Sequence, residues 1–198
     1  MKKLLVRLFC LVCAAGLVFS LWNIWTILSE YREGDRMYES AASQYVSSQP
    51  EQQAAAEKQP QFRFPPKVPI QVDFGHLKAQ NPDVVGWLYC EGTPINYPVM
   101  QGHTNADYLY TMLDGSYNKA GSLFLDCAAD PGFQDPAPVI YGHSMKNDSM
   151  FGTLHDFSKQ EYYDAHPVMW LLTPEKNWRL DLIAGYVTVD TDQVYQKL

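Results

Sequence analysis

The stretch Val139-Ile140-Tyr141-Gly142-His143-Ser144-Met145 joins a predicted strand to a candidate functional residue. Two β-branched residues and a tyrosine are typical of the end of a buried strand. Gly142 permits a sharp exit and places His143 just past the strand end, where rigid scaffolds commonly carry functional side chains. Imidazole ordinarily titrates near neutrality, so His143 is a candidate for proton transfer. A single histidine after a strand is more often a surface or capping residue, so the interpretation depends on its neighbours.

Several short segments surround this stretch in a definite order. They are NPDVVGWL at 81–88, INYPVMQG at 95–102, DYL at 107–109, GSLFLD at 121–126 and KNDSMFGTL at 146–154. The ordered set, which includes Tyr-Gly-His-x-Met at 141–145, resembles the class B sortases, the cysteine transpeptidases of Gram-positive cell surfaces. The resemblance covers about residues 81–189 together with the apolar N-terminal segment.

This resemblance implies a definite chemistry and definite partners. A cysteine thiolate attacks the sorting motif of a secreted protein, and an amine of a peptidoglycan precursor or cross-bridge resolves the thioacyl enzyme. A histidine donates a proton, and an arginine lies beside the developing oxyanion. His143 matches the family histidine, and no cofactor or metal is implied. By the same resemblance Asn105, Leu109 and Tyr141 are expected to line the sorting-motif groove.

Two of the three family side chains have no counterpart at the expected places. No residue after His143 is a cysteine. Arg179, the one later arginine, precedes the place where the cysteine strand belongs, so it is not assigned the arginine role. Cys90 and Cys127 are the only thiols beyond the apolar segment, and their sequence neighbours offer nothing that lowers a thiol pKa. We therefore expect this chain to lack the last two barrel strands.

The pattern of apolar residues predicts short strands with small helical insertions. Strands are expected at 84–89, 95–100, 121–126, 138–141, 168–173 and 178–189, and helical segments at 73–80, 105–113 and 149–157. Ser158 and Glu161 have the spacing of a capping box that starts another helical turn. Pro98 indicates an edge or a bulge in its strand. These elements predict a mostly antiparallel barrel or sandwich. The resemblance narrows the fold class to a mostly β, closed sortase-like β-barrel.

The N-terminus has the pattern of a membrane anchor. Lys2, Lys3 and Arg7 precede an uncharged run at 8–28, which matches the roughly 20 residues that a spanning helix needs. Trp22 and Trp25 near its end fit an interfacial position. The basic residues predict a single-pass protein with a cytoplasmic N-terminus and an extracellular C-terminal domain. A cleaved signal peptide is the alternative.

Composition suggests three parts, with a membrane anchor at 1–29, a polar and proline-rich stalk at 30–69, and a sortase-like domain at 70–198. Within the stalk, residues 30–49 carry apolar side chains at Met37, Ala41, Tyr45 and Val46, a spacing that permits an amphipathic helix. Residues 49–61 are rich in Gln, Ala, Glu and Pro, which is typical of a flexible spacer or a simple connector.

The charge and the cysteine pattern argue against nucleic-acid-binding proteins and structural zinc proteins. The formal net charge of -7 argues against a nucleic-acid partner. No Cys-x-x-Cys pair is followed by a second pair at metal-binding spacing, so a structural zinc site is not expected. A disulfide between Cys90 and Cys127 is left open by the sequence.

Two other functions remain open at this level. The unmatched nucleophile permits a non-catalytic, membrane-tethered extracellular module that binds peptide or cell-wall material. A histidine-dependent hydrolase of another family is the third possibility, and it would use Ser144 or a metal. Ser144 lacks the Gly-x-Ser-x-Gly elbow of such enzymes.

Overall fold

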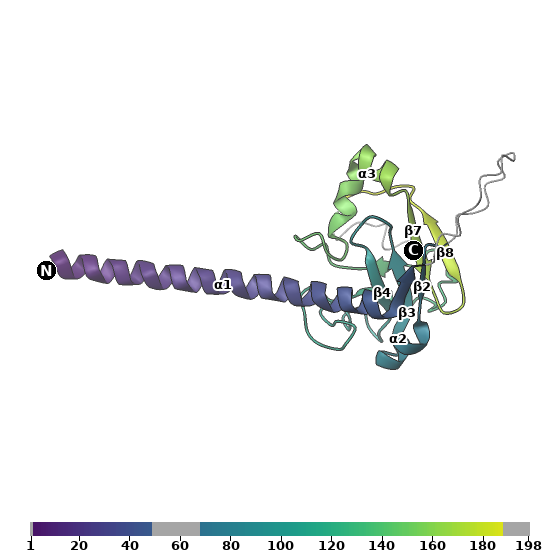
Figure 1. Cartoon of the computed structure of the whole chain (residues 1–198), viewed down its shortest axis with the longest axis horizontal. Helices are drawn as coiled ribbons and strands as arrows, with labels where there is room; N and C mark the ends of the chain where they lie inside the picture. The colour runs from purple at the N-terminus through teal and green to yellow at the C-terminus, as the bar shows by residue number, and fades with distance from the viewer. Residues whose placement is uncertain (1, 49–67, 188–198) are drawn as a thin grey trace.

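One long helix and a six-stranded sheet organise the protein, as Figure 1 shows. The computed structural model describes residues 2–48 and 68–187. The expected spacer at 49–61 and the expected strand end at 188–189 lie outside this range. The helices are α1 (Lys2–Tyr45), α2 (Phe74–Gln80), η1 (Gly152–Ser158) and α3 (Gln160–Ala165). The strands are β1 (Val46–Ser48), β2 (Ile70–Val72), β3 (Val84–Tyr89), β4 (Asn96–Met100), β5 (Leu123–Leu125), β6 (Ile140–Tyr141), β7 (Val168–Leu172) and β8 (Asn177–Asp181).

The larger sheet has the order β6-β5-β4-β3-β7-β8. Its neighbours pair antiparallel except for β4 and β5, which run parallel. The mostly β fold predicted from the sequence is therefore confirmed. Within the described residues the strands form an open half-barrel, and β6 and β8 are its two edges instead of partners in a closed barrel.

Pro98 lies on β4, an interior strand, but it has a partner on one side only. It is paired with Trp87 of β3, whereas β5 pairs with Val99 and Met100. Because Pro98 has no pairing partner in β5, its missing N–H does not remove a hydrogen bond between β4 and β5. The bulge lies in β3, where the register shifts between Val84 and Gly86.

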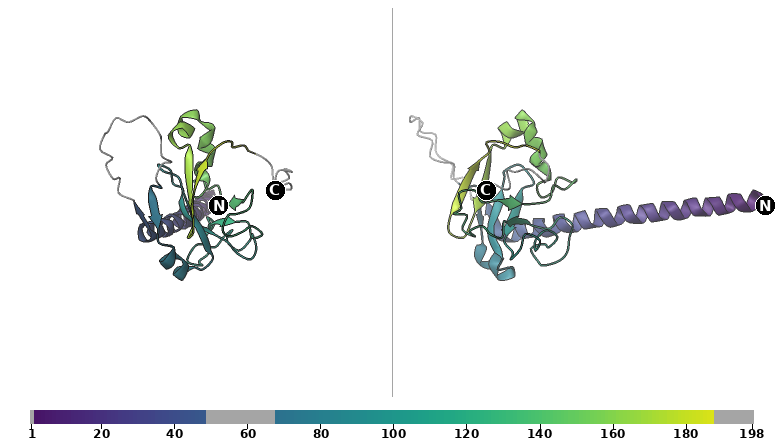
Figure 2. Two further views of the ribbon diagram at one scale, coloured as in Figure 1. Left: turned by 90° about the vertical axis from the view of Figure 1, so that its right-hand side faces the viewer. Right: turned by 180° about the vertical axis from the view of Figure 1, so that it is seen from behind.

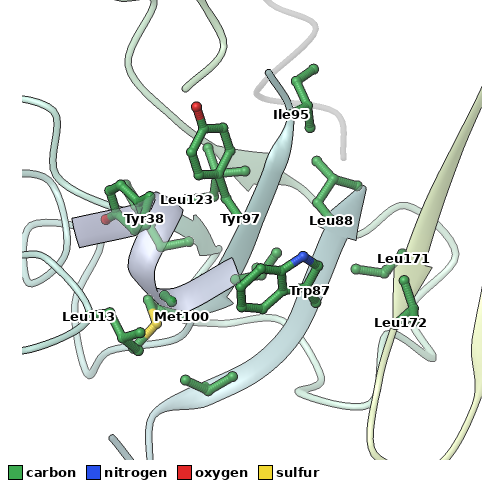
Figure 3. Close-up of a cluster of buried hydrophobic side chains, with 14 of the residues drawn as sticks. Tyr38, Trp87, Leu88, Ile95, Tyr97, Met100, Leu113, Leu123, Leu171 and Leu172 are labelled. Carbon is green, nitrogen blue, oxygen red and sulfur yellow. The ribbon is translucent and has the colours of Figure 1, made fainter. Parts of the chain in front are cut away.

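The core lies between the concave sheet and the second half of α1. Figure 3 shows Trp87 and Met100 from the sheet, together with Tyr38 of α1 beside Tyr97 and Leu123. The Tyr38 and Tyr97 rings meet edge to face, with 5.2 Å between their centroids. Such ring pairs add about 0.5–1.5 kcal/mol to the burial of the rings themselves.

Helix α1 continues without a break from the apolar segment into the folded domain (Figures 1 and 2). Ala41 and Tyr45 are buried and Met37 is partly buried, so the predicted amphipathic helix is confirmed as far as Tyr45, whereas Val46 begins β1. β1 then pairs with β2, and the Asp73 backbone N–H donates to the Tyr45 carbonyl at 2.8 Å. Residues 30–48 are therefore packed onto the domain instead of forming a free spacer. The other predicted boundaries, between a membrane anchor at 1–29 and the parts that follow it, stay a prediction.

The first half of α1 is exposed from Phe9 to Leu28 and carries no charged residue there. By length and composition it is able to cross a membrane, although a signal sequence meets the same criteria.

The expected helix at 105–113 is wrong, because local side chains satisfy the backbone there. Thr104 Oγ1 accepts from the Ala106 N–H, and Asp107 Oδ2 accepts from the Thr104 N–H at 3.0 Å. These bonds compete with helical ones. The segment is a series of turns.

Three other local expectations differ from the structure in detail. The helical segment expected at 149–157 is the 3₁₀ helix η1. The capping box is not formed, because the Ser158 hydroxyl donates to the His155 carbonyl at 2.8 Å and Lys159 occupies the N-cap of α3. The strand expected from residue 178 onward ends at Asp181 within the described residues.

Candidate functional site

His143 lies immediately after β6, and close packing requires a glycine before it. A Cβ atom at Gly142 would come within 2.3 Å of Leu123 Cδ2 and 2.8 Å of Phe151 Cδ2. The Phe151 N–H donates to the His143 carbonyl at 2.9 Å, and Ser144 forms a bridge with Met150. The loop that carries His143 is therefore closed on itself and fixed against the sheet.

The His143 ring is held on one face and at one nitrogen. Its Nε2 lies 2.8 Å from the Leu109 carbonyl oxygen. Because a carbonyl only accepts, Nε2 carries a proton in this arrangement. Tyr110 stacks on the ring, with 5.4 Å between the centroids and 28° between the planes. Nδ1 is the ring nitrogen left for exchanging a proton with another group.

A second set of contacts gathers around Asp126, just past β5. Its Oδ2 accepts from Asn105 Nδ2 at 2.9 Å and from the Tyr141 hydroxyl at 3.1 Å. The Ala128 backbone N–H, then Asn105 and Tyr141, hold the pKa of this carboxyl below its usual range. Asp126 is therefore a fixed anion next to β6.

The loop of His143 is also tied to α1. Asn147 Nδ2 donates to Asp35 Oδ2 at 3.0 Å, and burial raises the pKa of Asp35. A cavity of about 350 Å³ lies between α1 and the loops around Thr93 and Asn147, and it is not lined by His143.

The predicted site residues fall into two connected pairs. Leu109 contacts His143 through its carbonyl, and Asn105 is joined to Tyr141 through Asp126. Their role in a sorting-motif groove stays a prediction.

Sequence reasoning gave no role to Tyr110 or Asp126, although both adjoin residues that it singled out. Asp126 ends the predicted strand at 121–126, where polar side chains commonly serve a site. Tyr110 follows Leu109 directly, and no sequence signal indicated its stacking on His143.

The thiols of the domain differ in environment, and neither is activated by a charged partner in the described structure. Cys90 is buried, with Sγ 3.6 Å from the Val168 carbonyl, and burial raises the pKa of its thiol. This shift opposes formation of the thiolate that attacks a carbonyl. Cys127 is exposed and unpaired, so no disulfide joins it to Cys90.

The remaining polar candidates are engaged elsewhere or exposed. Arg179 Nη2 lies 2.7 Å from Asp181 Oδ1 on the same strand, β8. Ser144 is exposed at the start of the His143 loop. Within residues 2–48 and 68–187, no group of three or more His, Cys, Asp or Glu side chains is arranged to hold a metal ion.

Comparison with known proteins gives a consistent result, although no family model matches the chain. Sortase B of Staphylococcus aureus is 32% identical over 123 residues, which cover 62% of this chain and 50% of that protein. Sortase B of Listeria monocytogenes is 29% identical over 194 residues, which cover 98% of this chain and 74% of that protein. The chain thus spans about half the length of the first relative and about three quarters of the second.

The similarity is also found in the three-dimensional structure. The solved structure of sortase B from Listeria monocytogenes is 34% identical with a TM-score of 0.56, and the match covers 63% of this chain and 71% of that one. The open half-barrel is accordingly the arrangement of a known fold family. The chain belongs to the class B sortases.

Proposed function

We propose that this chain belongs to a membrane-anchored cysteine transpeptidase and supplies its histidine. The enzyme cleaves a C-terminal sorting motif of secreted proteins and joins them, through a thioacyl intermediate, to an amine of a peptidoglycan precursor or cross-bridge. The observation that carries the proposal is the placement of His143 in a class B sortase fold, with its ring fixed by the Leu109 carbonyl and Tyr110.

His143 is proposed as the proton donor to the leaving amine. Expulsion of an amine from a tetrahedral intermediate requires a proton, and a positioned imidazole supplies it near neutral pH. The bond from Nε2 to the Leu109 carbonyl fixes the ring orientation and leaves Nδ1 for the exchange. A fixed ring reacts without the entropic cost of orienting it.

Asn105, Leu109 and Tyr141 are proposed as part of the sorting-motif groove. Support comes from the contacts that bring Asn105 and Tyr141 to one carboxylate beside β6. Leu109 is half-buried and its backbone contacts His143. The groove would therefore begin next to the catalytic ring.

The proposed location is the cell membrane, with α1 as a single span. Its apolar length and the basic residues Lys2, Lys3 and Arg7 support a cytoplasmic N-terminus and an extracellular domain.

The reaction also requires a thiolate and a cation beside the oxyanion. Reading the coding DNA beyond codon 198 tests for them. A continuation that encodes a Thr-Cys strand and then a strand with an arginine supports transpeptidation. The full product of the gene should then cleave a fluorescent sorting peptide and, when hydroxylamine is the acceptor amine, convert its N-terminal fragment to a hydroxamate. Absence of both the continuation and the turnover would contradict the proposed activity.

A second candidate is a membrane-tethered module that binds sorting peptides without cleaving them. It is favoured by the buried state of Cys90, because burial raises the pKa of this thiol and opposes formation of the nucleophilic thiolate. The test mixes the 198-residue chain, in detergent micelles, with sorting peptides and a thiol-reactive probe. Saturable binding without cleavage supports this candidate, and cleavage rules it out.

A further inference from the structure

A tight hairpin at residues 110–119, here called the tyrosine hairpin, projects from the domain next to α1. The Asn118 N–H donates to the Tyr110 carbonyl at 3.0 Å, and the Met112 N–H donates to the Ser116 carbonyl at 2.9 Å. Gly115 at its tip has φ of 83°, a conformation that glycine adopts without strain. The hairpin is therefore a defined structural unit.

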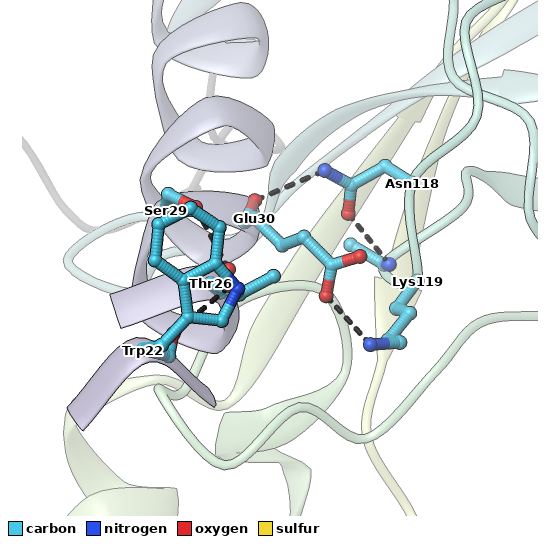
Figure 4. Close-up of polar contacts among 7 residues, drawn as sticks. Trp22, Thr26, Ser29, Glu30, Asn118 and Lys119 are labelled. Carbon is cyan, nitrogen blue, oxygen red and sulfur yellow. Dashed lines mark hydrogen bonds and ion pairs between the residues drawn. The ribbon is translucent and has the colours of Figure 1, made fainter. Parts of the chain in front are cut away.

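The base of the tyrosine hairpin is joined to α1 at Glu30 (Figure 4). The Asn118 side chain, only 2% exposed, donates from Nδ2 to the Glu30 carbonyl at 3.0 Å. Lys119 Nζ lies 2.7 Å from Glu30 Oε2. These two bonds fix the hairpin at one height along the helix.

That height coincides with the end of the apolar segment. The uncharged, exposed run of α1 ends at Leu28, and Glu30 is about 3 Å further along the helix axis, at 1.5 Å per residue. The polar layer on each side of a bilayer is roughly 5–7 Å thick. If α1 spans the membrane, the base of the hairpin lies within this layer.

The side chains that the hairpin exposes suit such a position. Tyr117 is 67% exposed and Tyr110 is 44% exposed, and no large apolar side chain within residues 68–181 is more exposed than Tyr117. The two rings lie 6.1 Å apart between centroids. Tyrosine is enriched at membrane interfaces because its ring is apolar and its hydroxyl is polar.

We propose that the tyrosine hairpin is a second membrane contact, in which Tyr117 and Tyr110 enter the lipid headgroup layer beside α1. The proposal rests on the proposed spanning role of α1. Tyr110 also stacks on His143. A row of three neighbouring rings therefore links the bilayer surface to the proposed catalytic histidine; the rings are those of Tyr117, Tyr110 and His143.

The test places a nitroxide on Tyr117→Cys in the full chain, after Cys10, Cys13 and Cys127 are replaced by serine. The protein is inserted into nanodiscs of phosphatidylglycerol and phosphatidylethanolamine, and the label's collision rates with oxygen and with a water-soluble nickel complex are compared. Glu175→Cys is the aqueous control, because the β7–β8 hairpin lies on the side of the domain away from the apolar part of α1 (Figures 1 and 2). Leu17→Cys is the control within the apolar run.

We expect the ratio of the oxygen collision rate to the nickel collision rate at position 117 to be several-fold the ratio at position 175. The ratio at position 17 should be higher still. A water-like ratio at position 117 together with a lipid-like ratio at position 17 overturns the proposal and leaves the span intact. A water-like ratio at position 17 overturns the span and, with it, the membrane contact. Because Tyr117 is mostly exposed, its replacement should leave the thermal unfolding of the domain unchanged.

Discussion

At the scale of single residues, Asp126 organises the polar part of the candidate site. One carboxylate receives Asn105 from a loop and Tyr141 from β6, two residues before His143. Its ionised form is the one that the folded protein stabilises, since the pKa of this carboxyl is lowered by donors from Ala128, Asn105 and Tyr141.

We predict that Asp126→Asn lowers the stability of the domain at neutral pH by about 1 kcal/mol, the usual size for a partly exposed hydrogen-bonded charge. A lowered carboxyl pKa stabilises the fold above the ordinary aspartate pKa of about 3.9, and this contribution is lost as pH falls through the folded-state value. The difference between wild type and Asp126→Asn should therefore shrink in acid. Urea unfolding at several pH values measures it, with the exposed Glu175→Gln as control. A difference that stays constant with pH would contradict this role.

The pairing of Asp126 with Asn105 and Tyr141 could not be predicted from the sequence. Periodicity located β5, which Asp126 follows directly, and β6, which carries Tyr141, and family resemblance singled out Asn105. The contact itself depends on how β5 pairs with β6 and on the turns at 104–109. Such tertiary contacts leave no local pattern, and the same holds for Tyr110 on His143.

At the scale of elements, α1 acts both as the apolar segment and as a part of the core. The spacing of Met37, Ala41 and Tyr45 predicted a helix, but the composition around it suggested a stalk. The sequence could not show that this helix packs on the sheet, because the partner surface comes from β4 and from the chain around Gly121 and Ser122. Most strands predicted from apolar runs were recovered with shifts of at most two residues at their ends, but the strand expected at 178–189 ends at Asp181 within the described residues.

We expect Tyr38→Ala to destabilise the domain by about 3–5 kcal/mol, the usual cost of removing a buried aromatic ring. Tyr38→Phe should cost about 1 kcal/mol, because it removes only the hydroxyl, which donates to the Gly121 carbonyl at 2.5 Å. Trp22→Ala is the matched control, since Trp22 is 65% exposed on the same helix. Urea unfolding of the full chain in detergent micelles measures all three variants. Equal midpoints for Tyr38→Ala and Trp22→Ala would show that α1 is not part of the core.

At the scale of the whole molecule, the folded unit extends into the N-terminal segment. Buried side chains of α1 and the pairing of β1 with β2 connect residues 38–48 to the domain. A boundary drawn from composition near residue 70 therefore divides a packed unit.

We predict that a protein of residues 29–198 unfolds cooperatively and that one of residues 61–198 does not. The shorter protein loses the buried rings of Tyr38 and Tyr45, each worth about 1.5–3 kcal/mol of burial, and total domain stabilities are about 5–15 kcal/mol. Near-ultraviolet circular dichroism during urea titration makes the comparison. Matching transitions for the two proteins would show that the helix is dispensable.

Replacement of His143 in the full product of the gene tests whether this residue donates the proton in peptide transfer. His143→Ala should reduce transfer of a sorting peptide to an amine by roughly two to four orders of magnitude, the usual contribution of general acid catalysis. The free energy of unfolding should fall by only about 1–2 kcal/mol, since one hydrogen bond to Leu109 and the stacking contact with Tyr110 are lost.

His155→Ala and His166→Ala are the matched controls, because neither lies in the Tyr-Gly-His-x-Met segment, and both should retain near-normal rates. The measurement is the rate of transfer to hydroxylamine or a peptidoglycan amine, with thermal unfolding of each variant recorded alongside. We expect His143→Ala to lose transfer while its fold is retained. Near-normal transfer by His143→Ala, or loss of transfer only together with loss of folding, would contradict it.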